Sequence, residues 1–283
     1  MIKRIQSFIG VLKDSKHPFR FIIGMVLMKS GLNRFFVISM NGYKIKFSRS
    51  ALAVTLFADA KERHEDEDFL TRVLKPGQVY VDIGANIGTL VLTASPLVGD
   101  KGKVYAVEAH PATFKHLEAN VALNQYANIE LINSAAGEKK GSIYFSNINS
   151  DDQNKVLLQQ SNGIEVKMDT LDNIFANLSH IDLLKIDVEG YEKYVLEGAA
   201  ITLAKTDLLY FESWEKHFKG FGYDTATILR ILKNAHFTVF KTGQDHLLTL
   251  PDNYHSAHCE NLVAIKNPEL FCSTYGYQMK INS

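Results

Sequence analysis

The sequence predicts an α/β fold in which a mostly parallel sheet carries helices on both faces and follows an N-terminal helical and β-hairpin extension. Three observations lead to this prediction. From residue 78 onward, short runs of β-branched residues alternate with helical stretches. The first run ends in a glycine turn that opens a helix, and the second run ends in a carboxylate, 20 positions after the last glycine of that turn.

The composition is that of a folded domain rather than of a polyanion-binding chain. Of the 283 residues 46% are hydrophobic, and 31 basic residues balance 31 acidic ones. A balanced charge argues against extensive binding to a nucleic-acid duplex. Cys259 and Cys272 have no C-x-x-C spacing, so we expect neither a disulfide framework nor a zinc site, and a cytoplasmic setting. We divide the chain into an extension, residues 1–70, and a main domain, residues 71–283.

The first 35 residues are basic and apolar, with seven cations against one acid. Apolar side chains recur among them at helical spacing, at Ile2, Ile5, Ile9 and Leu12. The segment 1–35 therefore either contacts an anionic membrane surface peripherally or packs as a helix on the main domain. The longest uncharged apolar run, residues 21–28, is too short to cross a bilayer and lies too deep for a secretory signal.

The remaining elements of the extension follow in order. Asn41-Gly42 separates two β-like runs, residues 36–40 and 43–47, and this pair favours a hairpin with a two-residue type I′ turn. Residues 51–60 and 65–74 have the pattern of helices. The second of these begins in an acidic cluster, which suits the positive end of a helix dipole.

The main domain continues with alternating elements. We expect the parallel core strands at residues 78–83, 103–108, 128–134, 181–187 and 207–211, with later strands at 237–241 and 261–266. We expect helices at residues 87–95, 111–125, 191–203 and 225–234. Residues 142–146 and 164–168 look like an antiparallel pair at the margin of the sheet. The tail after Pro268 is aromatic and predicts no element.

The glycine turn indicates a nucleoside cofactor. Gly84 suits a sharp turn with positive φ, and Gly88 suits close packing of the following helix on the sheet. Glu108 ends the next strand, where a carboxylate meets the hydroxyls of a bound ribose. The turn lacks the middle glycine of G-x-G-x-x-G, which argues against NAD or FAD, and Asp82 suits a ligand with an ammonium and a sulfonium group.

Polar side chains follow the ends of five predicted parallel strands. The carboxyl ends of such strands meet at one edge of an open sheet, where ligands bind. A single acid there is often a helix cap, whereas four acids on one edge indicate a site. Beyond the glycine turn, the strand ends carry Glu108, Asn133, Ser134, Asp187, Glu189 and Glu212.

Several motifs together resemble the FkbM-type methyltransferases. They are Val-Asp-Ile-Gly-Ala-Asn-Ile-Gly at 81–88, Glu108 with His110-Pro111 and Asn120, Thr-Leu-Asp at 170–172, Lys-Ile-Asp-Val-Glu-Gly-Tyr-Glu at 185–192 with Leu196 and Gly198, and Glu-Asn-Leu at 260–262. The resemblance covers residues 65–265, and the block at 185–192 is its most specific part. It implies a Rossmann-like, seven-stranded class I methyltransferase fold, S-adenosylmethionine as donor, and methylation of a hydroxyl on a sugar, glycan, glycolipid or related natural product.

The resemblance also implies a role for each site residue. Glu108 binds both ribose hydroxyls, and Asp187 lies where the sulfonium methyl group meets the acceptor. The methionine part lies in the turn of residues 82–88, against Asp82, Gly84, Ala85, Asn86 and Gly88. The adenine is flanked by Asn133, Ser134 and Ala135.

The acceptor hydroxyl must lose its proton, and two routes stay open. Asp187, Glu189 or Glu212 takes the proton as a general base, with His217 as a further candidate for base or substrate contact. Alternatively, Asp187 and Glu212 bind Mg²⁺, which acidifies a coordinated hydroxyl. For Glu192 we expect a solvated helix face or an ion pair with Lys185.

Other groups of side chains are weaker candidates. His255 and His258 with Asp252 imitate a metal site, but they lie in a late polar loop, and we interpret them as structural. The aromatic cluster of Trp214, Phe218, Phe221 and Tyr223 either stacks on a sugar face or packs under a loop.

Three other functions are weighed against the methyltransferase. An NAD-dependent oxidoreductase fits the first two strands but not the turn. A nucleobase methyltransferase needs an Asn/Asp-Pro-Pro-aromatic motif or a catalytic cysteine after the fourth strand, where this chain has Asp-Val-Glu-Gly at 187–190. The third is a non-catalytic binding module that keeps the cofactor fold at a membrane surface.

Overall fold

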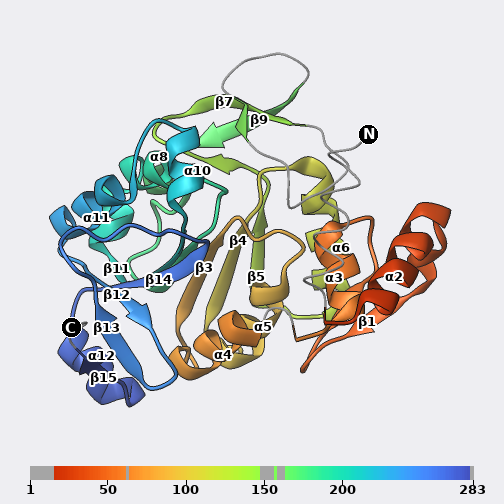
Figure 1. The fold of residues 1–283 in the computed structure, drawn as a ribbon, viewed down its shortest axis with the longest axis horizontal. Helices are drawn as coiled ribbons and strands as arrows, with labels where there is room; N and C mark the ends of the chain where they lie inside the picture. Colours follow the sequence, from red (N-terminus) through yellow and green to blue (C-terminus); the bar gives the residue numbers. More distant parts are fainter. Residues whose placement is uncertain (1–15, 62–63, 147–155, 158–162, 281–283) are drawn as a thin grey trace.

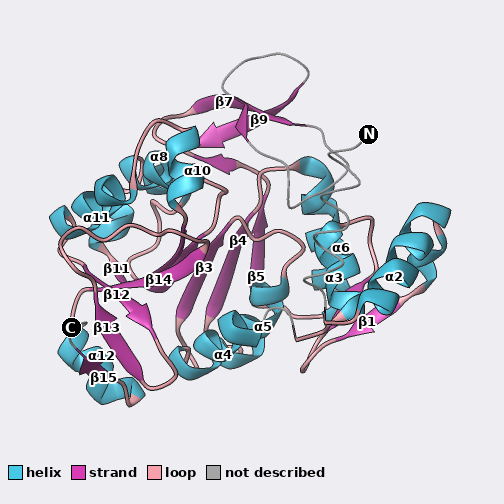
Figure 2. Cartoon of the chain, viewed as in Figure 1, coloured by secondary structure: helices cyan, strands magenta, loops and turns pink. Residues whose placement is uncertain are grey.

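The computed structural model describes residues 16–61, 64–146, 156–157 and 163–280, and a large twisted sheet forms its centre (Figures 1 and 2). The sheet has nine strands. In spatial order they are β15 (Gln278–Lys280), β13 (His246–Thr249), β12 (Thr238–Thr242), β14 (Glu260–Ile265), β11 (Thr206–Ser213), β10 (Ile181–Ile186), β3 (Val79–Ile83), β4 (Lys103–Val107) and β5 (Ile129–Ile132).

Seven of these strands form the predicted class I methyltransferase sheet. The strands β5, β4, β3, β10 and β11 pair in parallel, whereas β14 is inserted antiparallel between β11 and β12. Chain order reverses where β3 lies beside β10, and a reversal of this kind is where open α/β sheets bind ligands. The prediction of a mostly parallel, seven-stranded core is confirmed, and β13 and β15 extend it at one edge.

Helices cover both faces of the sheet, as predicted (Figure 2). On one face lie α4 (His64–Val73), α5 (Thr89–Val98) and α6 (Pro111–Asn124). On the other lie α7 (Leu171–Ile174), α8 (Glu192–Glu197), α9 (Ala200–Ala204) and α11 (Thr225–Asn234). The remaining helices of the main domain are α10 (Glu215–Gly220) and α12 (Pro268–Tyr275).

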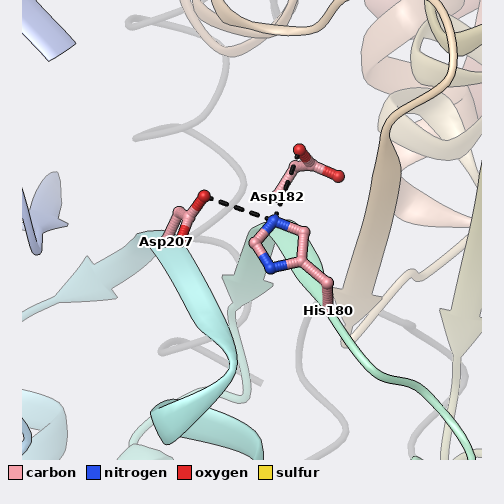
Figure 3. A group of neighbouring side chains, drawn as sticks. All are labelled: His180, Asp182 and Asp207. Carbon is pink, nitrogen blue, oxygen red and sulfur yellow. Dashed lines mark ion pairs between the residues drawn. The ribbon is translucent and has the colours of Figure 1, made fainter. Parts of the chain in front are cut away.

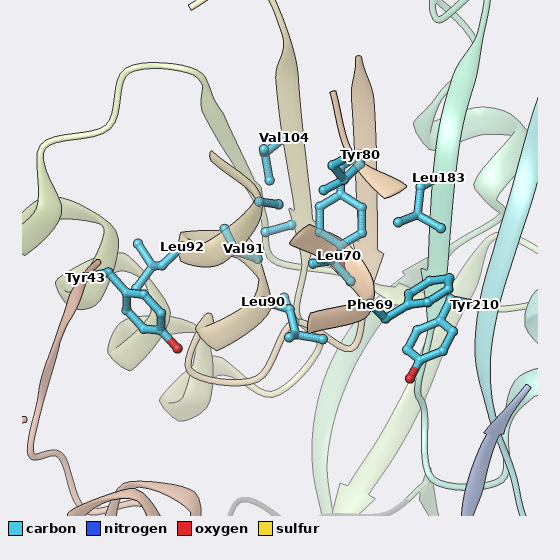
Figure 4. Close-up of a cluster of buried hydrophobic side chains, with 14 of the residues drawn as sticks. Tyr43, Phe69, Leu70, Tyr80, Leu90, Val91, Leu92, Val104, Leu183 and Tyr210 are labelled. Carbon is cyan, nitrogen blue, oxygen red and sulfur yellow. The ribbon is translucent and has the colours of Figure 1, made fainter. Parts of the chain in front are cut away.

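Successive residues of each central strand enter different cores. Tyr80 packs into the core under α4 and α5, and its neighbour Val81 packs into the opposite core. In the first core Leu70 of α4 is fully buried, and the Phe69 ring stacks on that of Tyr210 with centroids 4.4 Å apart (Figure 4). Burying such a side chain contributes roughly 1.5–3 kcal/mol, so these two layers hold the strands that carry the site.

The N-terminal extension contains α2 (Pro18–Ser30), the 3₁₀ helix η1 (Leu32–Phe35), β1 (Val37–Ser39), β2 (Lys44–Lys46) and α3 (Ala51–Ala58). The predicted hairpin is confirmed, because β1 and β2 pair antiparallel. The predicted type I′ turn is wrong, since such a turn needs positive φ at both central residues and only Gly42 has it. The predicted amphipathic helical pattern of residues 2–12 lies outside the described residues.

Asparagine side chains attach the hairpin to α6. The amide oxygens of Asn124 and Asn120 each accept a hydrogen bond of 2.8 Å, from the backbone N–H groups of Lys44 and Lys46. Asn120 is fully buried and also donates to the carbonyl of Ile87 at 2.8 Å. One side chain therefore joins the extension to the glycine turn.

A small second sheet lies beside the end of β5. Its strands, in order, are β6 (Ala135–Ala136), β9 (Gly163–Asp169), β7 (Gly141–Ser146) and β8 (Val156–Leu157). The predicted antiparallel pair is confirmed as β7 with β9. Among the described residues, no helix combines the length and the apolar character that crossing a membrane requires.

The prediction of one continuous helix at residues 191–203 is wrong. The helix expected at residues 191–203 is interrupted, because Gly198 packs so closely that a Cβ there would lie 2.0 Å from the carbonyl oxygen of Gly137. A new helix starts after it, where the Asp172 carboxylate accepts from the N–H groups of Ile201 and Thr202. The tail also forms regular structure, since α12 and β15 complete the edge of the sheet.

Candidate active site

A cleft of about 1800 Å³ opens where chain order reverses between β3 and β10. The glycine turn, Glu108 and the acids that follow β10 and β11 line it. Residues from the two sheets and from α4 thus meet in one space, although they are far apart in the chain. The cleft is large enough for a nucleoside cofactor and a second molecule beside it.

Gly84 is fixed by the packing of β3 against β10. Its φ is +83°, and a Cβ at this position would lie 1.9 Å from the carbonyl oxygen of Asp187. The N–H groups of Gly84 and Ala85 donate to the carbonyl of Val107 at 2.9 and 3.0 Å. The turn is therefore held from both neighbouring strands, and only glycine fits at position 84.

The predicted role of Gly88 in helix–sheet packing needs a correction. A Cβ at Gly88 would lie 2.5 Å from Cδ1 of Leu117, which belongs to α6. The close approach is therefore between the turn and a neighbouring helix. Gly88 also precedes α5 in the left-handed conformation.

Glu108 is buried and closes the cofactor turn. Its carboxylate accepts hydrogen bonds from the N–H group of Asn86 at 3.0 Å and from that of His110 at 2.8 Å. A carboxylate has about four acceptor positions, which makes this type of side chain suited to binding hydroxyl groups. Asn86 lies in the same turn, at φ 50°, and its Oδ1 is buried with no hydrogen bond among the described residues.

Ser134 and Ala135 line the cleft, but Asn133 does not. The side-chain amide of Asn133 donates to the carbonyls of Glu108 at 2.8 Å and Ala109 at 3.2 Å. Asn133 therefore braces the Glu108 turn from outside. The described apolar side chains on this wall of the cleft include Ile143 and Phe145 of the small sheet.

Asp82 and Asp187 share one buried lysine. Nζ of Lys185 lies 3.2 Å from Oδ1 of Asp82 and 3.3 Å from Oδ2 of Asp187. Burial raises the pKa of Asp82, and the ammonium of Lys185 offsets this shift. We expected the negative charge of Asp82 to face a cationic ligand, but Lys185 already neutralises part of this charge.

Two carboxylates and an imidazole meet on the wall of the cleft beyond Asp187. Nδ1 of His217 lies 3.7 Å from Oε2 of Glu189 and 3.5 Å from Oε2 of Glu212. Glu189 has φ 55°, a conformation unusual for a residue with a side chain, and such strain is often found at functional sites. Both carboxylates line the cleft, whereas His217 lies behind them against Trp214.

A thiol completes the surroundings of Glu212. Sγ of Cys259 donates a hydrogen bond of 2.9 Å to Oε1 of Glu212. Burial raises the pKa of this thiol, and the charge of Glu212 raises it further, so Cys259 stays protonated as a donor. Nothing in the sequence distinguished this cysteine as part of the site.

Glu192 is neither solvated nor paired with Lys185, so both expectations for it are wrong. It is buried, and its Oε1 accepts from the N–H groups of Val188 at 3.1 Å and Gly190 at 3.3 Å. Burial raises the pKa of Glu192 to about 8, and backbone hydrogen bonds, including the one from Val188, only partly oppose the shift. Glu192 therefore holds the turn that presents Glu189.

The aromatic cluster packs behind this turn rather than facing the cleft. The Tyr223 hydroxyl donates to the carbonyl of Gly190 at 2.6 Å, and its ring stacks on that of Phe218 at 4.9 Å. Trp214, Phe218, Phe221 and Tyr223 do not line the cleft. Of the two interpretations of this cluster, the structure shows packing under a loop.

Replacing Glu192 by Gln is expected to flatten the pH dependence of stability. The folded protein keeps a proton on Glu192 up to pH about 8, whereas the unfolded chain releases it near the ordinary pKa of 4.5. This contribution is fully present below pH 4.5 and is lost as the pH rises to 8, by up to about 1.4 kcal/mol per pH unit. Urea unfolding across this range measures the difference from wild type. Glu197→Gln, on the same helix, is the control, and equal slopes for wild type and Glu192→Gln would contradict the assignment.

Within the described residues, two groups of three side chains have the geometry to hold a cation. The first group is Glu189, Glu212 and His217. The second group, at the amino ends of β10 and β11, is His180, Asp182 and Asp207 (Figure 3). Nε2 of His180 lies 3.6 Å from Asp182 and 3.2 Å from Asp207, which ties the starts of β10 and β11 together. The predicted ligand Glu212 belongs to the first group, and Asp187 does not, because it pairs with Lys185.

Comparison with known proteins follows the same region of the chain. The model of the methyltransferase FkbM domain matches residues 82–239. The chain is 27% identical over 142 residues to Methyltransferase 1 of Beauveria bassiana, which covers 42% of this chain and 57% of that protein. It is 37% identical over 62 residues to a probable cobalt-precorrin-6B C(15)-methyltransferase of Sulfolobus acidocaldarius, covering 22% and 32%. It is 41% identical over 51 residues to ribosomal RNA large subunit methyltransferase E of Bdellovibrio bacteriovorus, covering 18% and 26%.

The chain thus aligns with between 26% and 57% of the length of these relatives. The family model is more extensive, because it spans more than half of the chain and runs from the glycine turn through β10, β11 and α11. The glycine turn, the buried acid after β4 and the acids at the ends of β10 and β11 lie in this shared region. The chain belongs to the FkbM family of S-adenosylmethionine-dependent methyltransferases.

Proposed function

We propose that the protein transfers the methyl group of S-adenosylmethionine to a hydroxyl of a sugar, a glycan or glycolipid, or a related natural product. The observation that carries this proposal is the group of Glu189, Glu212 and His217 on the wall of the cleft beyond Asp187. An alcohol is a poor nucleophile until it loses its proton, and these groups supply a proton acceptor beside the donor site. Carboxylates also accept hydrogen bonds from the several hydroxyls that a sugar presents.

The cofactor fits the turn through polar atoms that the protein leaves available. The buried Oδ1 of Asn86 accepts no hydrogen bond among the described residues, and it suits the ammonium group of the methionine part. Glu108, a buried carboxylate beside the turn, accepts hydrogen bonds from the ribose hydroxyls. Gly84, Ala85 and Gly88 supply the backbone of the turn. Asp82 pairs with Lys185, so it does not bind the sulfonium as a free carboxylate. It contributes to the electrostatic field around the sulfonium.

On the opposite side, Ser134 and Ala135 flank the adenine. Ile143 and Phe145 add an apolar wall there. We withdraw Asn133 from direct contact with the adenine, because its amide holds the carbonyls of Glu108 and Ala109.

The reaction is an in-line displacement. The acceptor oxygen forms a bond to the methyl carbon, the carbon–sulfur bond breaks, and its electron pair stays on sulfur to leave neutral S-adenosylhomocysteine. The proton of the hydroxyl goes to a carboxylate of the cleft. Holding the two reactants in line supplies most of the rate, so the protein acts mainly by positioning.

Glu212 is the proton acceptor that the geometry favours over Asp187. Asp187 already pairs with Lys185 at 3.3 Å, so its carboxylate is engaged by a cation of the protein. Glu212 is near Glu189, and His217 contacts both carboxylates and can share the proton that either takes up. In this proposal Asp187 orients the acceptor near the methyl group. Glu212 takes the proton, and Glu189 lies beside it.

A metal-assisted route is the second possibility for the same step. The ligand atoms of Glu189, Glu212 and His217 all lie within 4.8 Å of one another. Mg²⁺ prefers oxygen ligands, so a set that includes an imidazole suits a transition-metal ion better. The residues therefore fit Mg²⁺ poorly, and a chelator distinguishes the two routes.

The cleft argues against a nucleic-acid acceptor. More acidic than basic side chains line it, and phosphates near Glu189 and Glu212 would be repelled. A relative that acts on ribosomal RNA shares only 51 aligned residues with this chain. Both cysteines are free thiols, which supports the cytoplasmic setting that we propose for the reaction.

The test is methyl transfer from labelled S-adenosylmethionine to a panel of sugars, glycolipids and RNA, with and without EDTA. We expect incorporation into a hydroxylated sugar or glycolipid, and equal rates in EDTA because the carboxylates act as the base. Loss of turnover in EDTA would replace the carboxylate route by the metal route. Label in RNA alone, or stabilisation by NAD and not by S-adenosylmethionine, would contradict the proposed function.

A further inference from the structure

The N-terminal extension carries an exposed apolar ridge. Of the large hydrophobic side chains exposed in the described part of the chain, only Ile201, Leu270 and Met279 lie elsewhere. The extension forms one end of the molecule, away from the central sheet (Figure 1). The apolar ridge consists of Phe19, Ile22, Ile23, Val26, Leu32, Phe35, Phe36 and Val37.

The helix α2 is mostly apolar, with Arg20 and Lys29 as its charged residues, and one side of it is covered by the described residues. Its inner face packs on α3, where a Cβ at Gly24 would lie 3.1 Å from the ring of Phe57. Its outer face presents Phe19, Ile22 and Val26, which are 81%, 41% and 59% exposed. These residues follow helical spacing along one stripe. A contiguous exposed apolar stripe of this kind marks an interaction surface, so the stripe needs a second apolar environment.

The charge around the apolar ridge has one sign. No Asp or Glu occurs between residues 16 and 58. Among the cations of this interval, only Lys16 forms an ion pair with an acid in the described structure, at 3.9 Å from Asp59. The cations of the interval are Lys16, Arg20, Lys29, Arg34, Lys44, Lys46 and Arg49.

A basic pocket of about 410 Å³ lies beside the apolar ridge. Arg34, Lys46, Ser48, Arg49 and His116 line it, and we call these five residues the basic pocket. No acid pairs with its two arginines or its lysine in the part of the chain that the structure describes. The Ser48 hydroxyl is buried there without a hydrogen bond to any described residue. Guanidinium groups and a hydroxyl are the donors that bind a phosphate.

We propose that this surface docks on an anionic phospholipid bilayer, with the apolar ridge in the interface and a headgroup phosphate in the basic pocket. Each cation near such a membrane adds to binding, and the arginine stems carry their charges to the headgroup level. A second copy is a poorer occupant, because a twofold contact would set this cationic surface against itself. The docking does not depend on the methyl transfer, so either proposal can fail alone.

Flotation of the full chain with vesicles tests the docking. Vesicles of phosphatidylcholine with phosphatidylglycerol are expected to bind at least about tenfold more protein than phosphatidylcholine alone, and high salt to weaken binding. Ile22→Asp with Val26→Asp should lower binding at least about tenfold, because two charges then enter the interface. The control is Ile201→Asp with Leu270→Asp, two apolar residues outside the ridge that are at least as exposed, and this double variant should bind as wild type does. Equal loss in both double variants would overturn the proposal.

A second pair tests the basic pocket. Arg34→Glu with Arg49→Glu should abolish the preference for phosphatidylglycerol, whereas Lys101→Glu with Lys233→Glu, an equal charge change elsewhere, should keep it. Unchanged thermal melting in solution shows that each variant folds. One contrary outcome is that inorganic phosphate binds wild type but not Arg34→Glu with Arg49→Glu, and that the protein does not float with vesicles. This result would overturn the docking on a bilayer in favour of a site for free phosphate. A dimer in sedimentation velocity that Ile22→Asp with Val26→Asp dissociates would overturn it in favour of a second copy.

Discussion

Gly84→Ala is expected to destabilise the protein by about 3 kcal/mol or more and to abolish donor binding. The added Cβ would lie 1.9 Å from the carbonyl oxygen of Asp187, so β3 and β10 would have to separate at the point where both present site residues. The φ of +83° adds backbone strain of about 1–2 kcal/mol. Urea unfolding measures the stability, and titration calorimetry with S-adenosylmethionine measures the binding.

Gly77→Ala is the matched control for this change. Gly77 has a φ of +91°, close to that of Gly84, but nothing lies within 4 Å of a Cβ placed there. It should therefore cost only the backbone strain, about 1–2 kcal/mol, and bind the donor normally. Similar losses of stability and of binding in the two variants would show that strain, and not the contact between the strands, makes glycine necessary at position 84.

The cofactor half of the site was predictable because it depends on local sequence. A strand, a turn and a helix follow one another in the chain, so the turn at Gly84 and the acid Glu108 occur at fixed spacing. The parallel strands were predictable for the same reason, since each buried run lies between turn residues. The predicted family and fold are confirmed by the match to the FkbM domain and by the strand order.

The misplaced residues owe their positions to contacts between distant segments. Glu192 reads as a helix-surface acid, yet its carboxyl group turns back to the N–H groups of Val188 and Gly190. Asn133 stands at a strand end like a ligand contact, but the Glu108 turn takes up its amide. The helix break at Gly198 comes from close packing on Gly137, which lies 61 positions earlier in the chain. No local pattern reports such approaches.

The roles of the acids stay predictions, and their surroundings rank them. Sequence position treats Asp187, Glu189 and Glu212 alike, as acids after strand ends. The structure separates them by charge, because Lys185 pairs with Asp187, whereas the imidazole of His217 lies beside both Glu189 and Glu212. Proton transfer from the acceptor is therefore expected to depend most on Glu212 and its neighbour.

Glu212→Gln is expected to lower kcat by about 10²–10⁴-fold while the dissociation constant of S-adenosylmethionine stays unchanged. The amide keeps the shape of the side chain and still accepts from Sγ of Cys259, but it cannot take up a proton. Single-turnover methyl transfer to the acceptor found in the panel measures the rate, and calorimetry measures donor binding. A general base acts only in its deprotonated form, so wild-type kcat should rise with pH, and Glu212→Gln should lose this rise.

Two further variants decide what such a loss means. Glu260→Gln removes another carboxylate from the same cleft, one that is held by Lys241 at 2.7 Å and by Tyr254, and it should change kcat by less than about tenfold. If Glu260→Gln lowers kcat as much as Glu212→Gln does, the loss comes from the changed charge of the cleft and not from a base at Glu212. Asp187→Asn leaves Lys185 paired with Asp82 and should lower kcat without removing its pH dependence. If Asp187→Asn alone abolishes both the turnover and the pH dependence, Asp187 is the base, and the group around His217 only positions the acceptor.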